Sequence, residues 1–151
     1  MSNTAPTQTN LSTTLSNFEG AQAPANGAST AGYALTNSVF TTGYSDSDGN
    51  PNGIAITSVD NTKGLLWYSL DSGANWTPVS GVSANHALLL SGATTRLYYQ
   101  AKQTADGNLN YNGLNTGVLT YRAWDQTSGS NGGYGDTTVN GGASAFSAVE
   151  R

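Results

Sequence analysis

Residues 118–124 read VLTYRAW, a run rich in β-branched and aromatic side chains and without a helical period. Residues 95–100, TRLYYQ, have the same character. Such side chains favour the pleated surface of a strand, and about six residues is a usual strand length. These two runs are the clearest predicted strands, and they point to an all-β chain.

Shorter apolar runs lie around them. Residues 53–59, GIAITSV, alternate, so that Ile54 and Ile56 should share one face. Further strands are predicted within residues 65–70, 76–79 and 87–90. Glycine, asparagine and aspartate separate the runs, which recur at a spacing of about ten residues. This pattern predicts a single β-sandwich-like domain of roughly seven to ten short strands, with little helix and with long glycine-rich calcium-binding loops.

The composition bounds the functions that are open to this chain. Its 151 residues suit one domain, and only 9% of them are charged, with a net charge of −4. Five lysines and arginines cannot form a basic groove, which argues against nucleic-acid binding. No apolar run is long enough for membrane insertion, and the start MSNTAPTQTN has no signal pattern. The absence of cysteine excludes disulfides, thiolate metal sites and cysteine nucleophiles.

The chain divides into two parts by composition. Residues 1–30 are rich in threonine, serine, asparagine and alanine, and we expect a linker and N-terminal segment that packs on the domain. Residues 31–151 carry the predicted strands and should form a ligand-binding β domain.

Aspartate dominates the acidic residues, seven of nine, and it suits turns and calcium loops. The run DSDGN places Asp46, Asp48 and Asn50 at alternate positions, as calcium ligands often are. It is no EF-hand, because Pro51 and Thr57 occupy the positions of the required glycine and glutamate. A calcium site is favoured here over a plain acidic turn. For residues 106–113, DGNLNYNG, the plain turn is favoured.

A glycine-rich stretch over residues 125–144 holds six glycines and is too long for an ordinary connection. Asp125 opens it after a strand, and Asp136 and Asn140 return from its far end, so we expect these three to help hold one calcium. The residues expected to contact a ligand are Gln126, Ser128, Gly129, Tyr134, Gly141 and Gly142.

Catalysis finds little support in the sequence. His86 is the only histidine and has no nucleophile elbow near it. Asp125 and Asp136 are the remaining possibility, as a pair of glycosidase carboxylates. Residues 69–76, SLDSGANW, match an Asp-box, which is most simply a structural hairpin shaped by Asp71. We therefore expect a protein that is not an enzyme.

The ordered set of motifs GIAITSVD, LWYSLDSGANW, ALLL, RLYYQ, NYNG, LTYRAWDQTSG and NGGASAFS, over about residues 43–148, is similar to the calcium-dependent peptide-binding domain of bacterial RTX adhesins. The start NTAPTQT resembles the linker between cadherin-like repeats. The resemblance implies an extracellular, monomeric module of a longer adhesin on the bacterial cell surface. It further implies binding to the C-terminal ends of host-surface peptides, with Ca²⁺ contacting the terminal carboxylate.

Three other functions stay open. A cadherin-like module can serve only as an extender that calcium stiffens. A carbohydrate-binding module would use exposed aromatic rings, for which Trp124, Tyr134 and Tyr111 are the candidates. A hydrolase is the third.

Overall fold

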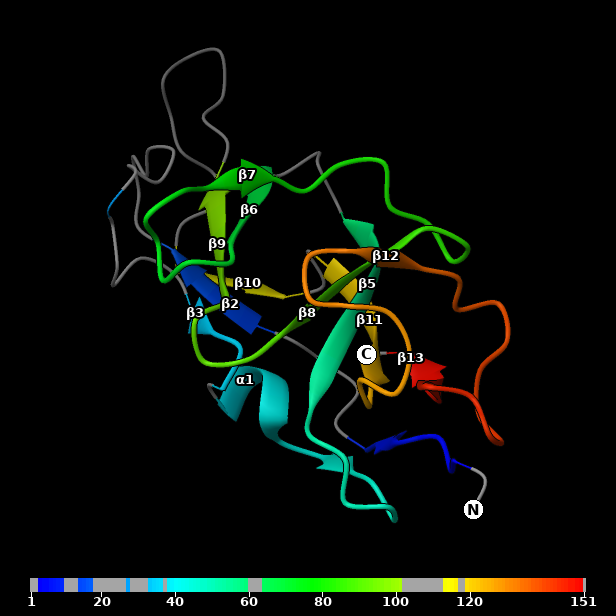
Figure 1. The fold of residues 1–151 in the computed structure, drawn as a ribbon. Coiled ribbons are helices and arrows are strands. Elements are labelled where there is room, and N and C mark those ends of the chain that lie inside the picture. Colours follow the sequence, from blue (N-terminus) through cyan, green and yellow to red (C-terminus); the bar gives the residue numbers. More distant parts are fainter. Residues whose placement is uncertain are drawn as a thin grey trace.

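The structure is a computed structural model, and it describes residues 3–9, 14–17, 27, 33–36, 38–59, 64–101, 113–116 and 119–150. The fold is all-β and consistent with a β-sandwich, as the sequence predicts (Figure 1). In the described residues the one helix is α1 (Ser38–Thr41). The strands are β1 (Thr7–Gln8), β2 (Thr14–Asn17), β3 (Tyr33–Ala34), β4 (Tyr44–Ser45), β5 (Gly53–Val59), β6 (Gly64–Ser69), β7 (Thr77–Pro78), β8 (Ala87–Ser91), β9 (Arg96–Ala101), β10 (Gly113–Thr116), β11 (Leu119–Trp124), β12 (Tyr134–Gly135) and β13 (Phe146–Glu150).

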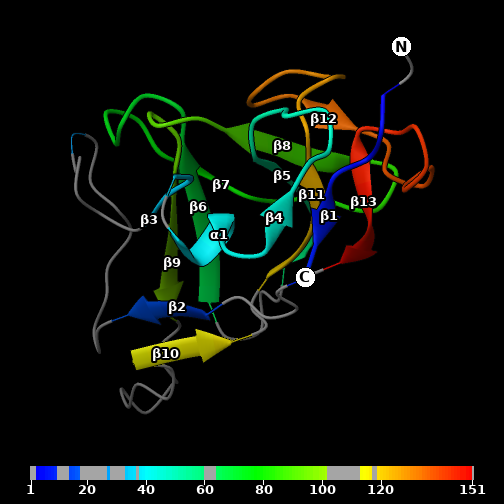
Figure 2. The same cartoon turned by 90° about the horizontal axis from the view of Figure 1, so that it is seen from below.

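Two main sheets carry the fold, and all strand pairs are antiparallel. The larger sheet has the order β12-β8-β5-β11-β13, and the smaller has the order β3-β9-β6-β7. Two further ribbons pair β1 with β4 and β2 with β10. Through these ribbons the described parts of the N-terminal segment pack onto the domain. Strand β1 lies between β4 and β13 (Figure 2).

The main core lies between the two sheets. Ile54 and Ile56 both belong to it, on the shared face that the alternation predicts. The facing sheet contributes Leu66 and Leu97. Each of these four side chains is fully buried, and burying such a side chain stabilises a fold by roughly 1.5–3 kcal/mol.

A second apolar cluster involves the other set of side chains on β5 and β8. It contains Ala55, Ala87, Leu89, Trp124, Ala145 and Phe146. Successive side chains on a strand point to opposite faces, so these two strands are buried on both. The glycine-rich stretch covers the cluster: Leu89 exchanges backbone hydrogen bonds with Gly132 and Gly133, of 2.7 and 2.9 Å.

Each predicted strand corresponds to an observed one, but thirteen strands are assigned among the described residues. Most of the additional ones are two-residue pairings such as β1 and β12. Strand β13 is a longer addition, of five residues. The sequence does not predict it, because FSAVE has no clear apolar alternation. In the described part of the chain, no helix is long and apolar enough to cross a membrane. The predicted turn at residues 106–112, with Tyr111, lies outside the described residues.

Candidate metal centre and adjoining groove

The predicted calcium loop is a tight turn that follows β4. One oxygen of Asp46, Oδ1, accepts hydrogen bonds from the backbone N–H of Asp48 at 2.7 Å and of Asn50 at 3.4 Å. Gly49 closes the turn with a φ of 77° and a hydrogen bond from its N–H to the Asp46 carbonyl of 3.1 Å. The other oxygen, Oδ2, is buried and has no hydrogen-bond partner among the described residues. A buried carboxylate oxygen is costly to leave without a partner, so Asp46 Oδ2 is a candidate ligand for a cation.

Asp125 stands at the end of β11, where the chain leaves the sheet. The residue is only 1% exposed. Its Oδ1 accepts from the Thr127 N–H at 2.9 Å and from the Thr127 hydroxyl at 2.5 Å. Its Oδ2 accepts from the Asn3 side-chain amide at 2.7 Å. The strand end thus holds a buried carboxylate whose partners are neutral.

The N-terminal segment joins these two loops. Asn3 donates to Asp125, and its Oδ1 accepts from the Asn50 side chain at 3.3 Å. The next residue, Thr4, donates its N–H to Asp48 Oδ2 at 2.7 Å. These contacts bring two predicted calcium loops into one place. We call this set the acidic cluster; it consists of Asn3, Asp46, Asp48, Asn50, Asp125 and Thr127.

The acidic cluster has a negative field. Tyr44, whose hydroxyl donates to the Asn50 carbonyl at 3.0 Å, has its pKa raised well above the ordinary value, first by burial and then by the charges of Asp46 and Asp125. The ion pair described in the structure, between Arg122 and Glu150 at 3.6 Å, belongs to another region. Among the described residues, no lysine or arginine side chain forms an ion pair with a carboxylate of the acidic cluster.

The donor set fits a hard cation that prefers oxygen. Ca²⁺ takes six to eight oxygen ligands, which carboxylates, amides, carbonyls and water supply. Among the described residues no three histidine, aspartate or glutamate side chains converge closely enough to hold a metal ion by themselves. An ion here would need Asp46 Oδ2 together with amide, hydroxyl or carbonyl oxygens of the acidic cluster, and water.

Asp136 and Asn140, the other predicted calcium ligands, have local roles. Asp136 is exposed, and its Oδ1 accepts from the Thr138 hydroxyl at 2.6 Å and N–H at 2.9 Å, which lowers its pKa. The Asn140 side chain donates to the Thr137 carbonyl at 3.0 Å. These hydrogen bonds stay within the residues' own turn, whereas those of Asp125 lead to Asn3 and Thr127.

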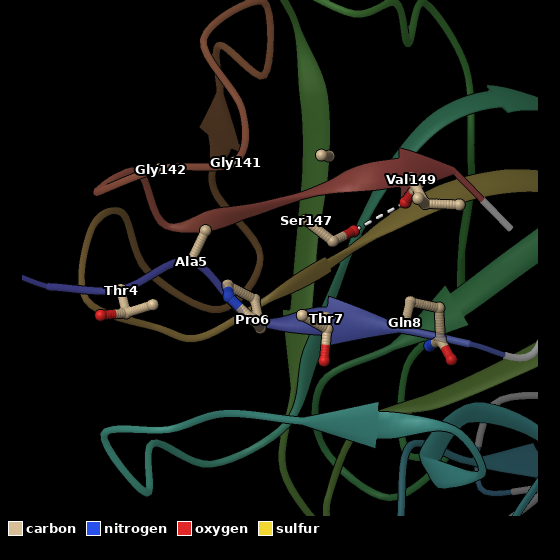
Figure 3. Close-up of a pocket in the computed structure, with 10 residues that line it drawn as sticks. Thr4, Ala5, Pro6, Thr7, Gln8, Gly141, Gly142, Ser147 and Val149 are labelled. Atoms are coloured by element: carbon tan, nitrogen blue, oxygen red, sulfur yellow. Dashed lines mark hydrogen bonds between the residues drawn. The ribbon is translucent and has the colours of Figure 1, made fainter.

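A groove of about 350 Å³ adjoins the acidic cluster, between β1 and β13 (Figure 3). Its lining residues are Thr4, Ala5, Pro6, Thr7, Gln8, Gly141, Gly142, Ser147, Ala148 and Val149. Figure 3 shows Thr4 and Gly142 toward one end, and Gln8 and Val149 toward the other. Because Thr4 also donates to Asp48, the first end borders the acidic cluster.

The predicted ligand-binding residues fall in several places. Gly141 and Gly142, with φ of 68° and 58°, line the groove, and Ala5 donates its N–H to the Gly142 carbonyl at 2.8 Å. Gln126, next to Asp125, donates to the carbonyl of Asn52 at 3.2 Å.

Two of them, Ser128 and Gly129, also contact the second apolar cluster. The Ser128 carbonyl accepts from the Trp124 indole N–H at 2.8 Å. Gly129 packs closely on Leu89: a Cβ added to Gly129 would lie 2.4 Å from Leu89 Cδ1. Trp124 itself is 1% exposed, which removes it as a sugar platform.

Tyr134 is at the rim of the sandwich, where its ring stacks on His86 with centroids 4.0 Å apart. Asn3 and Thr4 are the site residues that sequence reasoning missed, since nothing in a polar N-terminal run marks them as partners of Asp125 or Asp48.

A scan against protein-family models, a search of curated proteins and a search of solved structures found no match.

Proposed function

We propose that this chain is a calcium-dependent ligand-binding module of a bacterial surface adhesin, which takes the C-terminal carboxylate end of a host-surface peptide. The observation that carries the proposal is the contact between Thr4 and Asp48, because it places the acidic cluster at the end of the groove. The module would be extracellular, monomeric within a longer chain, and not an enzyme.

Calcium supplies the positive charge that a carboxylate ligand needs. The chain has a net charge of −4 and the acidic cluster is negative, so either would repel a peptide C-terminus. A bound divalent cation reverses the local field and offers open coordination positions. Asp46 Oδ2 is the best-supported ligand, since it is buried and has no partner among the described residues. Asp48 is exposed, which leaves this side of the acidic cluster open to an incoming carboxylate.

The groove suits the residues that precede the carboxylate. Its volume of about 350 Å³ lies within the range of small-ligand pockets and can take a few residues. Gly142 has no side chain, and an added Cβ there would meet nothing within 4 Å, so a peptide backbone can approach closely. Val149, 45% exposed, offers apolar contact toward the far end. Selectivity would come mainly from the chain end.

An extender that calcium stiffens is the second candidate. The observation in its favour is that Asn3 and Thr4, which lead into the domain, are themselves partners of the acidic cluster. A cation held there would fix the N-terminal segment to the loops. The two functions differ in one respect, which is whether the groove takes a ligand.

Fluorescence anisotropy with short labelled peptides tests the proposal. Each peptide is prepared as a free acid and as an amide, and is titrated with calcium or with EGTA. We expect binding only for the free acid with calcium, and loss of binding in Asp46→Asn. Equal binding of acid and amide would refute the carboxylate model, and stabilisation by calcium without any peptide binding would favour the extender.

Asp136→Asn is the matched control. Asp136 is exposed and bonded within its own turn, so peptide binding should be unchanged if calcium sits at the acidic cluster. If this variant loses binding and Asp46→Asn retains it, the calcium belongs to the glycine-rich stretch, as the sequence alone suggested. Circular dichroism of each variant checks that it is folded.

A further inference from the structure

The ring stack of Tyr134 and His86 is an exposed feature that peptide binding does not use. The two rings are almost parallel, with an interplanar angle of 6° and centroids 4.0 Å apart. Tyr134 lies opposite Leu88 at the edge of the larger sheet, and His86 closes the bridge with Ser83 just before β8. We call these two rings the rim stack.

The Tyr134 ring of the rim stack is partly exposed to solvent. Tyr134 is 47% exposed although His86 covers one face of its ring. Because His86 covers one face of the ring, the exposed area of the residue lies elsewhere on it. Leu70, 39% exposed, packs against Gly132, two residues before Tyr134: its Cδ1 would lie 2.6 Å from an added Cβ on that glycine.

The backbone holds the rim stack in place before any ligand arrives. Both the N–H and the hydroxyl of Thr137 donate to the Ala84 carbonyl at 2.7 Å. Ser83 and His86 exchange backbone hydrogen bonds of 3.2 and 3.1 Å. A ligand that stacks on a ring fixed in this way loses little free energy in ordering the protein.

Polar residues flank the rim stack in the sequence. Asp136 follows Tyr134 by two residues, just beyond the end of β12. The Asp136 carboxylate accepts hydrogen bonds from the N–H and the hydroxyl of Thr138. Those bonds end on Oδ1, and the exposed residue presents its second oxygen to solvent. Asn85, which precedes His86 in the chain, is exposed, and its side chain accepts from the Ser83 hydroxyl at 2.7 Å.

We propose that the rim stack, with Asp136 and Asn85, is a second binding site, independent of calcium, for a neutral hexopyranose sugar. The C–H face of such a sugar packs on an open aromatic ring, and its hydroxyls pair with carboxylate and amide groups. The net charge of −4 disfavours anionic sugars. A quaternary ammonium ligand would need several rings around it, whereas the rim stack is a single pair of rings.

Two-dimensional ¹H–¹⁵N NMR tests this site with methyl β-D-galactopyranoside and methyl β-D-glucopyranoside, in the presence of EGTA. We expect saturable shifts at Tyr134, His86 and Asp136 with at least one sugar. Tyr134→Ala should weaken binding by about tenfold, and Asp136→Asn should also weaken it. Tyr134→Phe keeps the ring and should bind as the wild type does.

Val139→Ala is the control, because Val139 is a 73% exposed apolar side chain in the same stretch but outside the rim stack. It should leave sugar binding unchanged. The site is refuted if neither sugar produces saturable shifts, if the shifts map to the acidic cluster, or if Val139→Ala weakens binding as much as Tyr134→Ala does. Chelator is present throughout, so failure of the calcium-dependent peptide site does not affect the result.

Discussion

Ser69 shows how a single hydroxyl holds the Asp-box hairpin. Its Oγ donates to Asp71 Oδ1 at 2.8 Å and accepts from the Gly73 N–H at 2.8 Å, while the residue is 1% exposed. Ser69→Ala leaves a buried N–H without its partner, so we expect the free energy of unfolding to fall by about 1–3 kcal/mol in urea denaturation. Ser80→Ala, at an exposed position, should change it by less than about 0.5 kcal/mol. Equal effects would contradict the assigned role.

Asp71 gives the same hairpin a pH dependence. Its pKa is lowered from 3.8, first by the Asn75 side chain and then by the Asn75 N–H and the Ser69 hydroxyl. A lowered pKa in the folded state means that the stabilisation is complete above 3.8 and is lost as the pH falls through the folded value. The stability advantage of wild type over Asp71→Asn should therefore shrink between about pH 6 and about pH 2. If urea titrations show the same stability advantage at every pH, the ionised Asp71 carboxylate does not stabilise the hairpin.

At the scale of elements, the glycine-rich stretch is a cover for the larger sheet. Gly129→Ala introduces a Cβ 2.4 Å from Leu89 Cδ1 and strains a φ of +74°, so we expect a loss of roughly 1–3 kcal/mol in thermal or urea unfolding. Gly142→Ala is the matched control, because its φ is also positive, at +58°, but an added Cβ meets nothing within 4 Å. It should lose only about 1 kcal/mol. Equal losses would show that Gly129 is not packed against the sheet.

Strand β13 is an edge strand that a single arginine supports. Its register with β11 shifts between the pairs of Arg122 and Trp124. The Arg122 guanidinium donates to the carbonyls of Ser147 at 3.0 Å and Ala148 at 2.7 Å. Irregular pairing of this kind protects a sheet edge from further strands.

For the whole molecule, the acidic cluster predicts that calcium and stability are linked. An ion that binds only the folded state adds about 2.7 kcal/mol when its concentration is a hundred times Kd. Calcium should therefore raise Tm, EGTA should reverse the rise, and Asp46→Asn should reduce it. Sodium chloride at matched ionic strength is the control, because any salt screens the repulsion within a chain of net charge −4 and can raise Tm in this way. Identical melting curves with calcium and chelator would mean that the acidic cluster is only a set of polar turns.

The fold class and the positions of the main strands follow from local sequence patterns. Alternation places Ile54 and Ile56 on one face, and the Asp-box specifies its own hairpin, because both depend on neighbours a few residues apart. Strand β13 escaped prediction, since its pairing depends on Arg122 and on a shifted register rather than on its own pattern.

Which polar residues meet depends on how the strands pair across the whole domain. Asn3 and Asp125 are separated by 122 positions, and no local pattern relates them. Their contact exists because β1 pairs with β4, which brings the N-terminal segment beside the end of β11. The glycine-rich stretch is the converse case. Its composition favours a binding loop, and the tertiary structure adds a packing role. Glycines allow the backbone to approach Leu89 closely enough to cover the second apolar cluster of the larger sheet.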